Sequence, residues 1–105
     1  MTWGDWPMKE ITPVEVKDLL ESGKQLNLVD VREADEVADG MIPGAIHIPL
    51  GDVEARVSEL DKSKPYILIC RSGGRSGRAT AFLEGAGYNA ANMTGGMLEW
   101  EGKTE

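Results

Sequence analysis

The sequence contains only one cysteine and one histidine among its 105 residues. A single cysteine excludes an internal disulfide and a cysteine-based metal cluster, and it is typical of proteins in a reducing cytoplasm. No apolar run is long enough to cross a membrane as a helix, and the first residues lack the basic and apolar regions of a signal peptide. The length and the hydrophobic content of 41% predict one soluble globular domain, which the single cysteine places in the cytoplasm.

Acidic side chains are also missing from Lys62 to Leu83, a stretch of 22 residues. At the chain's average composition, about four of its 18 acidic residues would fall in such a window. Three of the five arginines, Arg71, Arg75 and Arg78, lie there instead. The net charge of -7 disfavours nucleic acids and anionic membranes as partners, whereas this cationic window favours a small anion.

The cysteine lies inside the acid-free window. An apolar run over residues 65–70 ends at Cys70, and a helical pattern follows over about residues 76–86. Between them, Gly73 and Gly74 allow a tight turn. A strand, a glycine turn and a helix start form an anion cradle, because backbone N–H groups converge there and the helix N-terminus is partly positive. Such a cradle favours the thiolate form of a cysteine at its mouth, so Cys70 is the candidate nucleophile.

Short apolar segments alternate with helical spacings along the rest of the chain. Strands are expected within residues 8–11, 26–32, 42–50, 66–69 and 88–93, and helices within residues 12–23, 33–39, 51–60, 76–86 and 95–100. This alternation predicts βαβ units and a mostly parallel sheet between two layers of helices. Ligand sites in such sheets lie at the carboxyl ends of strands, which is where Cys70 is expected.

The motif C-x4-R lies in the segment Cys70-Arg71-Ser72-Gly73-Gly74-Arg75-Ser76, which resembles the active-site loop of small single-domain thiosulfate sulfurtransferases of the rhodanese type. Four other segments match that family in the same order. They are Asp30-x-Arg32 at a strand end, the signature from Glu36 and Gly40 to Ile42-Pro43-Gly44-Ala45, the pair Ile48-Pro49, and Gly95-Gly96 with Trp100. The resemblance covers about residues 8–102, so residues 1–7 are expected to form a flexible lead-in and residues 103–105 a C-terminal tail.

This resemblance implies a rhodanese-like three-layer α/β/α fold around a central, mostly parallel sheet of about five strands. It also implies that Cys70 takes the sulfane sulfur of thiosulfate as a persulfide and passes it to cyanide or to a thiol, including that of a thioredoxin-like protein. The substrate-binding residues would be Arg71, Ser72, Gly73, Gly74, Arg75 and Ser76. No metal, cofactor or general base is expected, and the protein is expected to be a monomer or a weak dimer.

Three charged residues are expected to support the site structurally rather than chemically. They are Asp30 and Arg32 at the end of one strand and Glu36 shortly after it. We expect Arg32 to pair with Glu36 and so to hold the polar connection behind the loop.

Other residues depart from the family pattern or stand apart from the candidate site. Met41 occupies the position where the family often has a histidine, which should alter local hydrogen bonding but not the chemistry. The lone His47 lies in an apolar segment bounded by prolines and is interpreted as structural. Trp3 and Trp6 are interpreted as residues at the edge of the core or in a frayed terminus.

Three other interpretations of Cys70 stay open. A buried core thiol would explain the apolar run, but not the arginines, the paired glycines or the missing acids. A cysteine-dependent phosphatase also combines a cysteine, an anion cradle and an arginine, but with C-x5-R spacing, and an arsenate reductase of related fold differs in the same way. Finally, the domain could be non-catalytic, or it could relay persulfide sulfur between proteins.

Overall fold

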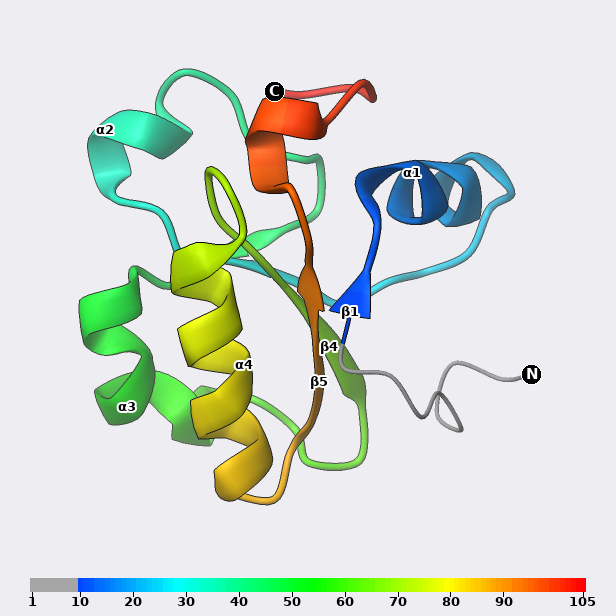
Figure 1. Cartoon of the computed structure of the whole chain (residues 1–105). Coiled ribbons are helices and arrows are strands. Elements are labelled where there is room, and N and C mark those ends of the chain that lie inside the picture. Colours follow the sequence, from blue (N-terminus) through cyan, green and yellow to red (C-terminus); the bar gives the residue numbers. More distant parts are fainter. Residues whose placement is uncertain (1–9) are drawn as a thin grey trace.

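The structure is a computed structural model and describes residues 10–105. The expected lead-in at residues 1–7, with Trp3 and Trp6, and the first part of the expected strand 8–11 lie outside the described residues. Five strands form one sheet in which all neighbours are parallel, in the order β1-β5-β4-β2-β3 (Figure 1). The strands are β1 (Glu10–Ile11), β2 (Leu28–Asp30), β3 (Ile46–His47), β4 (Pro65–Ile69) and β5 (Asn89–Met93).

Helices cover both faces of this sheet (Figure 1). They are α1 (Pro13–Glu21), α2 (Ala34–Val37), α3 (Val53–Arg56) and α4 (Gly74–Gly85), with 3₁₀ turns η2 (Leu50–Asp52), η3 (Val57–Glu59) and η4 (Gly96–Glu99). Leu68 and Ala90 belong to the core shared with α3 and α4, whereas Ile67 and Ala91 belong to the core shared with α1. Successive strand residues thus serve opposite layers, which confirms the expected three-layer α/β/α architecture. Within residues 10–105, no helix is long and apolar enough to span a membrane.

The segment boundaries differ most from the expectations at two places. The helix expected from residue 76 begins two residues earlier, at Gly74, because Gly73 takes a left-handed conformation (φ 103°) that turns the chain directly into the helix. The helix expected over residues 51–60 is divided into η2, α3 and η3, and the residues at the two junctions, Asp52 and Arg56, have φ values of −103° and −109°. The weakly strand-like residues 88–93 contain β5, which lies inside the sheet between β1 and β4.

A buried ion pair lies at the carboxyl end of β2. The Arg32 guanidinium donates hydrogen bonds of 2.9–3.1 Å to the Asp30 carboxylate, and both side chains are buried. Its remaining N–H groups reach the backbone carbonyls of Gly40 at 2.7 Å and Glu36 at 3.3 Å. The expected pairing of Arg32 with the Glu36 side chain is therefore wrong. A buried carboxylate two residues away requires the cation more strongly than a half-exposed one does.

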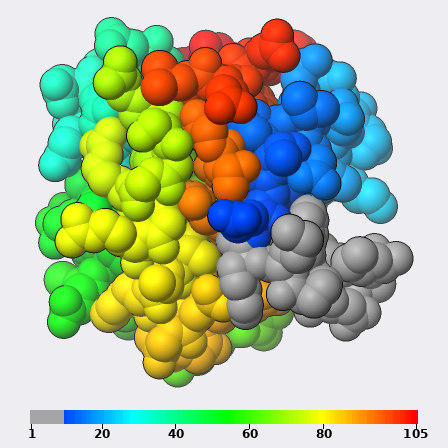
Figure 2. All heavy atoms as spheres, in the orientation of Figure 1, coloured from blue at the N-terminus to red at the C-terminus, as the bar shows by residue number. Residues whose placement is uncertain are grey.

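The C-terminal residues lie against the segment that follows α2. The N–H of Met41 donates to the Glu105 carbonyl at 3.0 Å, and the N–H of Glu105 donates back to the Met41 carbonyl at 2.9 Å. The indole N–H of Trp100 donates to the Lys103 carbonyl at 3.0 Å. In Figure 2 the chain from β5 onward reaches the surface between α4 and α1. These contacts tie the end of the chain to the connection between β2 and β3.

Replacing Arg32 by alanine should strongly destabilise the fold. The Asp30 carboxylate, with no exposed surface, would then be buried without its cation, at a cost of about 3–5 kcal/mol in the free energy of unfolding. Urea unfolding measures this loss. The matched control is Arg56→Ala, which removes an arginine from the exposed pair with Glu59 and should leave the unfolding midpoint almost unchanged. Equal midpoints for the two variants would contradict a stabilising role for the buried pair.

Candidate active site

The loop between β4 and α4 wraps around the Cys70 sulfur. β4 ends at Ile69, and the N–H of Gly73 donates to Cys70 Sγ at 2.9 Å. This N–H points at the sulfur because Gly73 is left-handed, a conformation that side chains rarely adopt. A Cβ at Gly73 would also approach the backbone nitrogen of Gly95 to 3.2 Å. The glycine therefore allows both the turn and the close packing behind it.

A second donor reaches the sulfur from the first turn of α4. The Ser76 hydroxyl lies 3.2 Å from Cys70 Sγ, and both residues are buried. Burial raises the pKa of the Cys70 thiol, but hydrogen bonds from the Ser76 hydroxyl and from the N–H groups of Ser76, Gly73 and Ser72 outweigh it. The net effect is a pKa below the ordinary value of a cysteine, as expected for a sulfur at a helix start.

Cys70 is also part of the hydrophobic core, with only 1% of its surface exposed. The hypothesis of a buried core thiol therefore describes its burial correctly. It does not account for the hydrogen-bond donors directed at Sγ, because a thiol that only fills the core needs none. A nearly enclosed sulfur surrounded by N–H and O–H donors suits a small nucleophile whose charge must be stabilised without water.

Arg75, the second residue of α4, is paired with a carboxylate. Its two terminal nitrogens donate to the two oxygens of Glu36 at 2.7 Å each. The hydrogen bond with Arg75 is the main reason why the pKa of Glu36 is lowered to about 2, and the same bond raises the pKa of Arg75. The charge at the site is therefore not purely positive, as the acid-free stretch 62–83 suggested. The fold brings the Glu36 carboxylate to the site from another part of the sequence. Arg71 and Ser72 are exposed on the loop.

The turn after β5 holds the loop through backbone hydrogen bonds. The N–H of Met97 donates to the Cys70 carbonyl at 2.9 Å, and the N–H of Leu98 donates to the Arg71 carbonyl at 2.9 Å. A Cβ at Gly96, which is left-handed, would lie 2.5 Å from these carbonyl oxygens. Gly96 is thus required because two backbones meet there, whereas Gly95 takes a left-handed conformation (φ 74°).

Asn92 is a member of the site that the sequence did not reveal. It lies on β5, where its amide N–H donates to the Gly73 carbonyl at 3.0 Å and its amide oxygen accepts from the Ser76 hydroxyl. Its only signal in the sequence is a polar side chain between Ala91 and Met93, both of which are buried. This pattern was too weak to identify Asn92 as a site residue.

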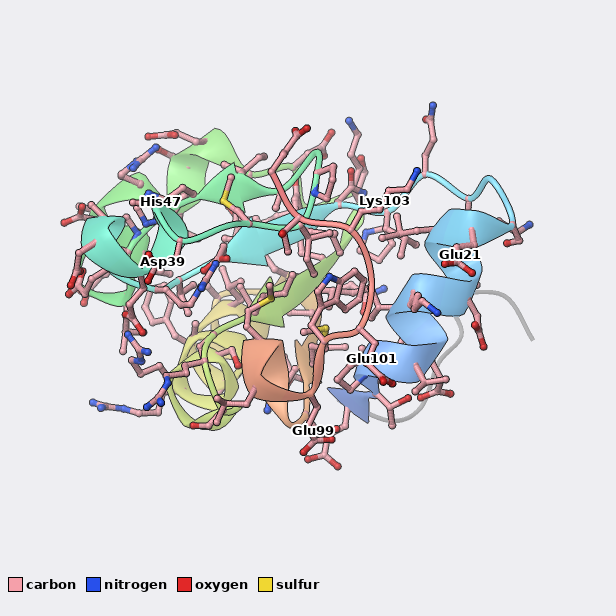
Figure 3. All side chains as sticks on the ribbon, turned by 90° about the horizontal axis from the view of Figure 1, so that it is seen from above. Glu21, Asp39, His47, Glu99, Glu101 and Lys103 are labelled. Atoms are coloured by element: carbon pink, nitrogen blue, oxygen red, sulfur yellow. The ribbon has the colours of Figure 1, made fainter. Side chains whose placement is uncertain are left out.

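The remaining residues singled out in the sequence lie beside the site. Asp30 and Arg32 form the buried pair described above, which holds the end of β2. Asp30 is also paired in register with Ile69, the last residue of β4. His47 lies at the β3 edge of the sheet, on the side of α2 (Figure 3), and its Nε2 is 2.7 Å from the Arg32 carbonyl. The structural role expected for these residues from the sequence stays a prediction.

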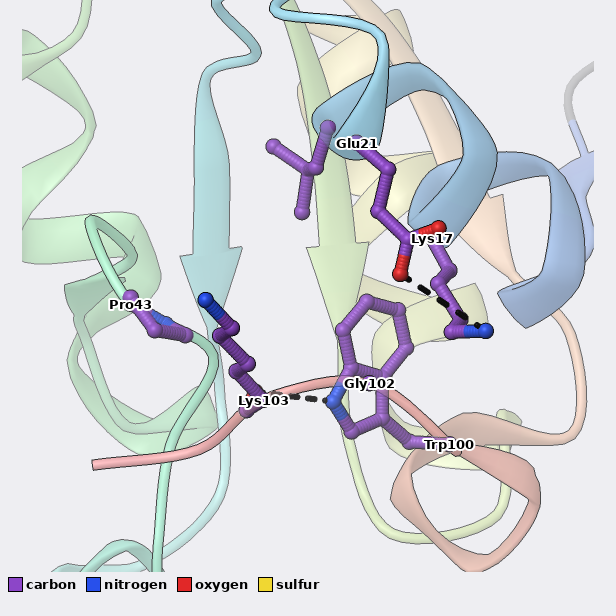
Figure 4. Close-up of a pocket in the computed structure, with 7 residues that line it drawn as sticks. Lys17, Glu21, Pro43, Trp100, Gly102 and Lys103 are labelled. Carbon is purple, nitrogen blue, oxygen red and sulfur yellow. Dashed lines mark hydrogen bonds and ion pairs between the residues drawn. The ribbon is translucent and has the colours of Figure 1, made fainter.

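Two surface hollows differ in their relation to the loop. One, of about 500 Å³, lies beside the start of α4 and is lined by Arg75, Arg78 and Phe82 together with residues of η2 and α3. The other, of about 520 Å³, lies between α1 and the C-terminal segment (Figure 4). Trp100 and Lys103 line it, and none of its lining residues belongs to the loop. Of these two hollows, the first lies nearer the loop, which it meets at Arg75, and Cys70 lines neither of them.

This chain is similar in sequence and fold to known proteins. Residues 12–103 match the family described as rhodanese-like domain. The chain is 46% identical over 98 residues to "Putative sulfurtransferase YtwF" of Bacillus subtilis, covering 93% of this chain and 95% of that protein. It is 41% identical over 97 residues to "Putative sulfur carrier protein YrkF" of the same bacterium, covering 91% of this chain and 52% of that protein.

A solved structure shows the same likeness. The crystal structure of a rhodanese-like domain protein from Staphylococcus aureus matches this fold with a TM-score of 0.88 and 36% sequence identity. The match covers 93% of this chain and 97% of that one. Family match, sequence identity and fold agree over nearly the whole chain. The chain belongs to the rhodanese-like domain family.

Proposed function

We propose that this protein is a rhodanese-type sulfurtransferase that carries sulfane sulfur from thiosulfate to an acceptor as a persulfide on Cys70. The observation that carries this proposal is the pair of donors on Cys70 Sγ, the N–H of Gly73 and the hydroxyl of Ser76. They favour the thiolate, which is the nucleophilic form of the residue. Relatives named as a sulfurtransferase and a sulfur carrier support the same chemistry.

In the first step the Cys70 thiolate attacks the outer sulfur of thiosulfate. A bond forms between Sγ and that sulfur, the sulfur–sulfur bond of thiosulfate breaks, and sulfite leaves with the electron pair. The negative charge of the thiolate ends on the outer sulfur of the persulfide. No proton moves when the attacking species is already a thiolate, so the step requires no general base.

In the second step an acceptor attacks the outer sulfur of the persulfide. Cyanide gives thiocyanate, and a thiolate gives a new persulfide on the acceptor. The bond to Sγ breaks and the electron pair returns to Cys70, which restores the thiolate. The N–H groups at the start of α4 stabilise the negative sulfur in both states, because they were already oriented by the turn at Gly73.

Arg71 is the residue we propose for attracting the donor. It is exposed on the loop directly after Cys70, and among residues 10–105 it has no ion-pair partner. Thiosulfate and the departing sulfite are both dianions, so an unpaired guanidinium at the mouth raises their local concentration. Glu36 balances the positive charge of Arg75, so the substrate meets an ion pair with no net charge.

A relay between proteins is the second candidate function. The hollow beside the start of α4 has a partly apolar lining with Leu50 and Phe82, which suits a protein that brings its own thiol to the loop. A cysteine-dependent phosphatase remains less favoured, because the C-x4-R spacing leaves a shorter loop than C-x5-R for the oxygens of a phosphoryl group. Assays with thiosulfate and with p-nitrophenyl phosphate distinguish these chemistries.

Incubation with thiosulfate should add one sulfur atom to the wild-type protein, as measured by intact mass. Cys70→Ser should gain none and should form no thiocyanate from thiosulfate and cyanide, because the nucleophile is gone. Its urea midpoint should stay close to that of the wild type, since serine is of similar size. Thiocyanate formation by a folded Cys70→Ser protein would overturn the proposed mechanism.

The balance of charge in the pair of Arg75 and Glu36 should control the KM for thiosulfate. Arg75→Gln leaves the Glu36 carboxylate unpaired near the cradle, so repulsion of the dianion should raise KM roughly tenfold at low ionic strength. The double variant Arg75→Gln/Glu36→Gln is neutral, like the intact pair, and should restore most of the affinity. If its KM stays as high as that of Arg75→Gln, the guanidinium binds the substrate directly.

A further inference from the structure

The Ser76 hydroxyl lies between two hydrogen-bond acceptors. Its oxygen is 3.2 Å from Cys70 Sγ and 2.5 Å from the amide oxygen of Asn92. A serine hydroxyl has one hydrogen, so it cannot donate to both acceptors at the same time. The hydrogen can therefore point either to Cys70 Sγ or to Asn92. In each orientation, the other acceptor has no hydrogen bond from Ser76.

The orientation of the Asn92 amide follows from its other contact. Its amide nitrogen donates to the Gly73 carbonyl at 3.0 Å, so the amide oxygen must face Ser76. The reverse orientation would place two acceptors against each other at Gly73. Gly77 leaves the room for this arrangement, because a Cβ there would lie 3.3 Å from the amide nitrogen of Asn92. The site thus contains a fixed acceptor that competes with the sulfur.

We propose that Asn92 is a positioning residue that makes Ser76 a two-position donor. The hydroxyl hydrogen points to Asn92 while Sγ is uncharged, and it turns to Sγ when the sulfur becomes a thiolate. Because a hydrogen bond to a charged acceptor is stronger than one to a neutral amide, the thiolate wins the competition. Because Asn92 accepts the same hydrogen, the thiolate is stabilised less than it would be without the asparagine.

The two orientations of this hydrogen follow the steps of the proposed sulfur transfer, on which this inference rests. In the persulfide, Sγ is bonded and uncharged, and the negative charge lies on the outer sulfur. The Ser76 hydrogen then returns to Asn92. When an acceptor removes the outer sulfur, the electron pair returns to Sγ and the hydrogen turns back to it. Asn92 therefore favours the loaded protein, and Ser76 stabilises the thiolate as it leaves.

Charged side chains also lie on the loop and on neighbouring elements, and the proposed substitutions leave them unchanged. They include Arg71, Arg75, Arg78, Asp30, Arg32, Glu33, Glu36, Asp52, Glu54 and Glu99. Ser76 and Asn92 are neutral, so apolar replacements at these two positions remove hydrogen bonds without changing any formal charge. A shift in the titration of Cys70 then reports the donors and not the electric field.

The test measures the pKa of Cys70 in four proteins: the wild type, Ser76→Ala, Asn92→Leu and the double variant. Cys70 is the only cysteine, so the ultraviolet absorbance of its thiolate, with Cys70→Ser as the blank, reports this residue alone. Ser76→Ala should raise the pKa by about one unit, because a donor to the thiolate is lost. Asn92→Leu should lower it by about half a unit to one unit, because the competing acceptor is lost.

The double variant separates competition from a simple structural effect. Without the hydroxyl there is nothing to compete for, so Asn92→Leu should not shift the pKa in the Ser76→Ala protein. An equal shift in both backgrounds, or an upward shift in the wild type, would mean that Asn92 acts through the Gly73 carbonyl and would overturn the proposal. Asn92→Ala, which also removes the amide oxygen, serves as a second variant should leucine prevent folding.

Asn27→Leu is the matched control. The amide of Asn27 donates to the Pro65 carbonyl at 3.1 Å, at the opposite end of β4, where no hydroxyl competes. We expect no change in the pKa of Cys70 in this variant. All these titrations are made without a sulfur donor, so their failure would leave the persulfide experiment unaffected. Failure of the persulfide experiment would likewise leave the hydrogen-bond competition testable.

Discussion

The hydrogen bond from the Gly73 N–H to Cys70 Sγ is the contact on which the rest of the site depends. It exists because a loop of only four residues, Cys70 to Gly73, joins β4 to α4, and its last residue is left-handed. A parallel sheet places this turn at the carboxyl ends of its strands, where the helix start adds partial positive charge. The sulfur is therefore stabilised by backbone groups that need no reorganisation when charge appears on it.

Three separate parts of the chain hold this turn in place. Glu36 of α2 binds the guanidinium of Arg75, and Asn92 of β5 binds the Gly73 carbonyl. The turn at Gly96 binds the Cys70 carbonyl through the N–H of the next residue. A loop held by three other elements loses little entropy when a substrate binds, which favours a site for a small anion.

Much of this arrangement could be predicted from the sequence. The order of strands and helices follows from hydrophobic spacing, and the apolar run that ends at Cys70 placed the cysteine at the correct edge of the sheet. The glycines at positions 73 and 96 mark backbone conformations that other residues avoid, so they were visible as paired glycines. Features of this kind depend on a few neighbouring residues, so a short segment of sequence is enough to predict them.

Side-chain partners across long distances in the sequence were not predictable in the same way. Arg75 and Glu36 are 39 residues apart, and a local window of charge cannot show that they meet. Arg32 was assigned to Glu36, but the burial of Asp30 decides its partner. Asn92 was missed because a single polar residue in a weak strand pattern has no distinctive spacing.

The measurement that tests the account most directly is the release of sulfite before any acceptor is present. Mixing the protein with excess thiosulfate should release one equivalent of sulfite per chain in a rapid burst, because the sulfur stays on Cys70. Turnover should begin only when cyanide or a thiol is added. If sulfite appears only together with the acceptor, the sulfur passes directly from donor to acceptor, and the role assigned to Cys70 is wrong.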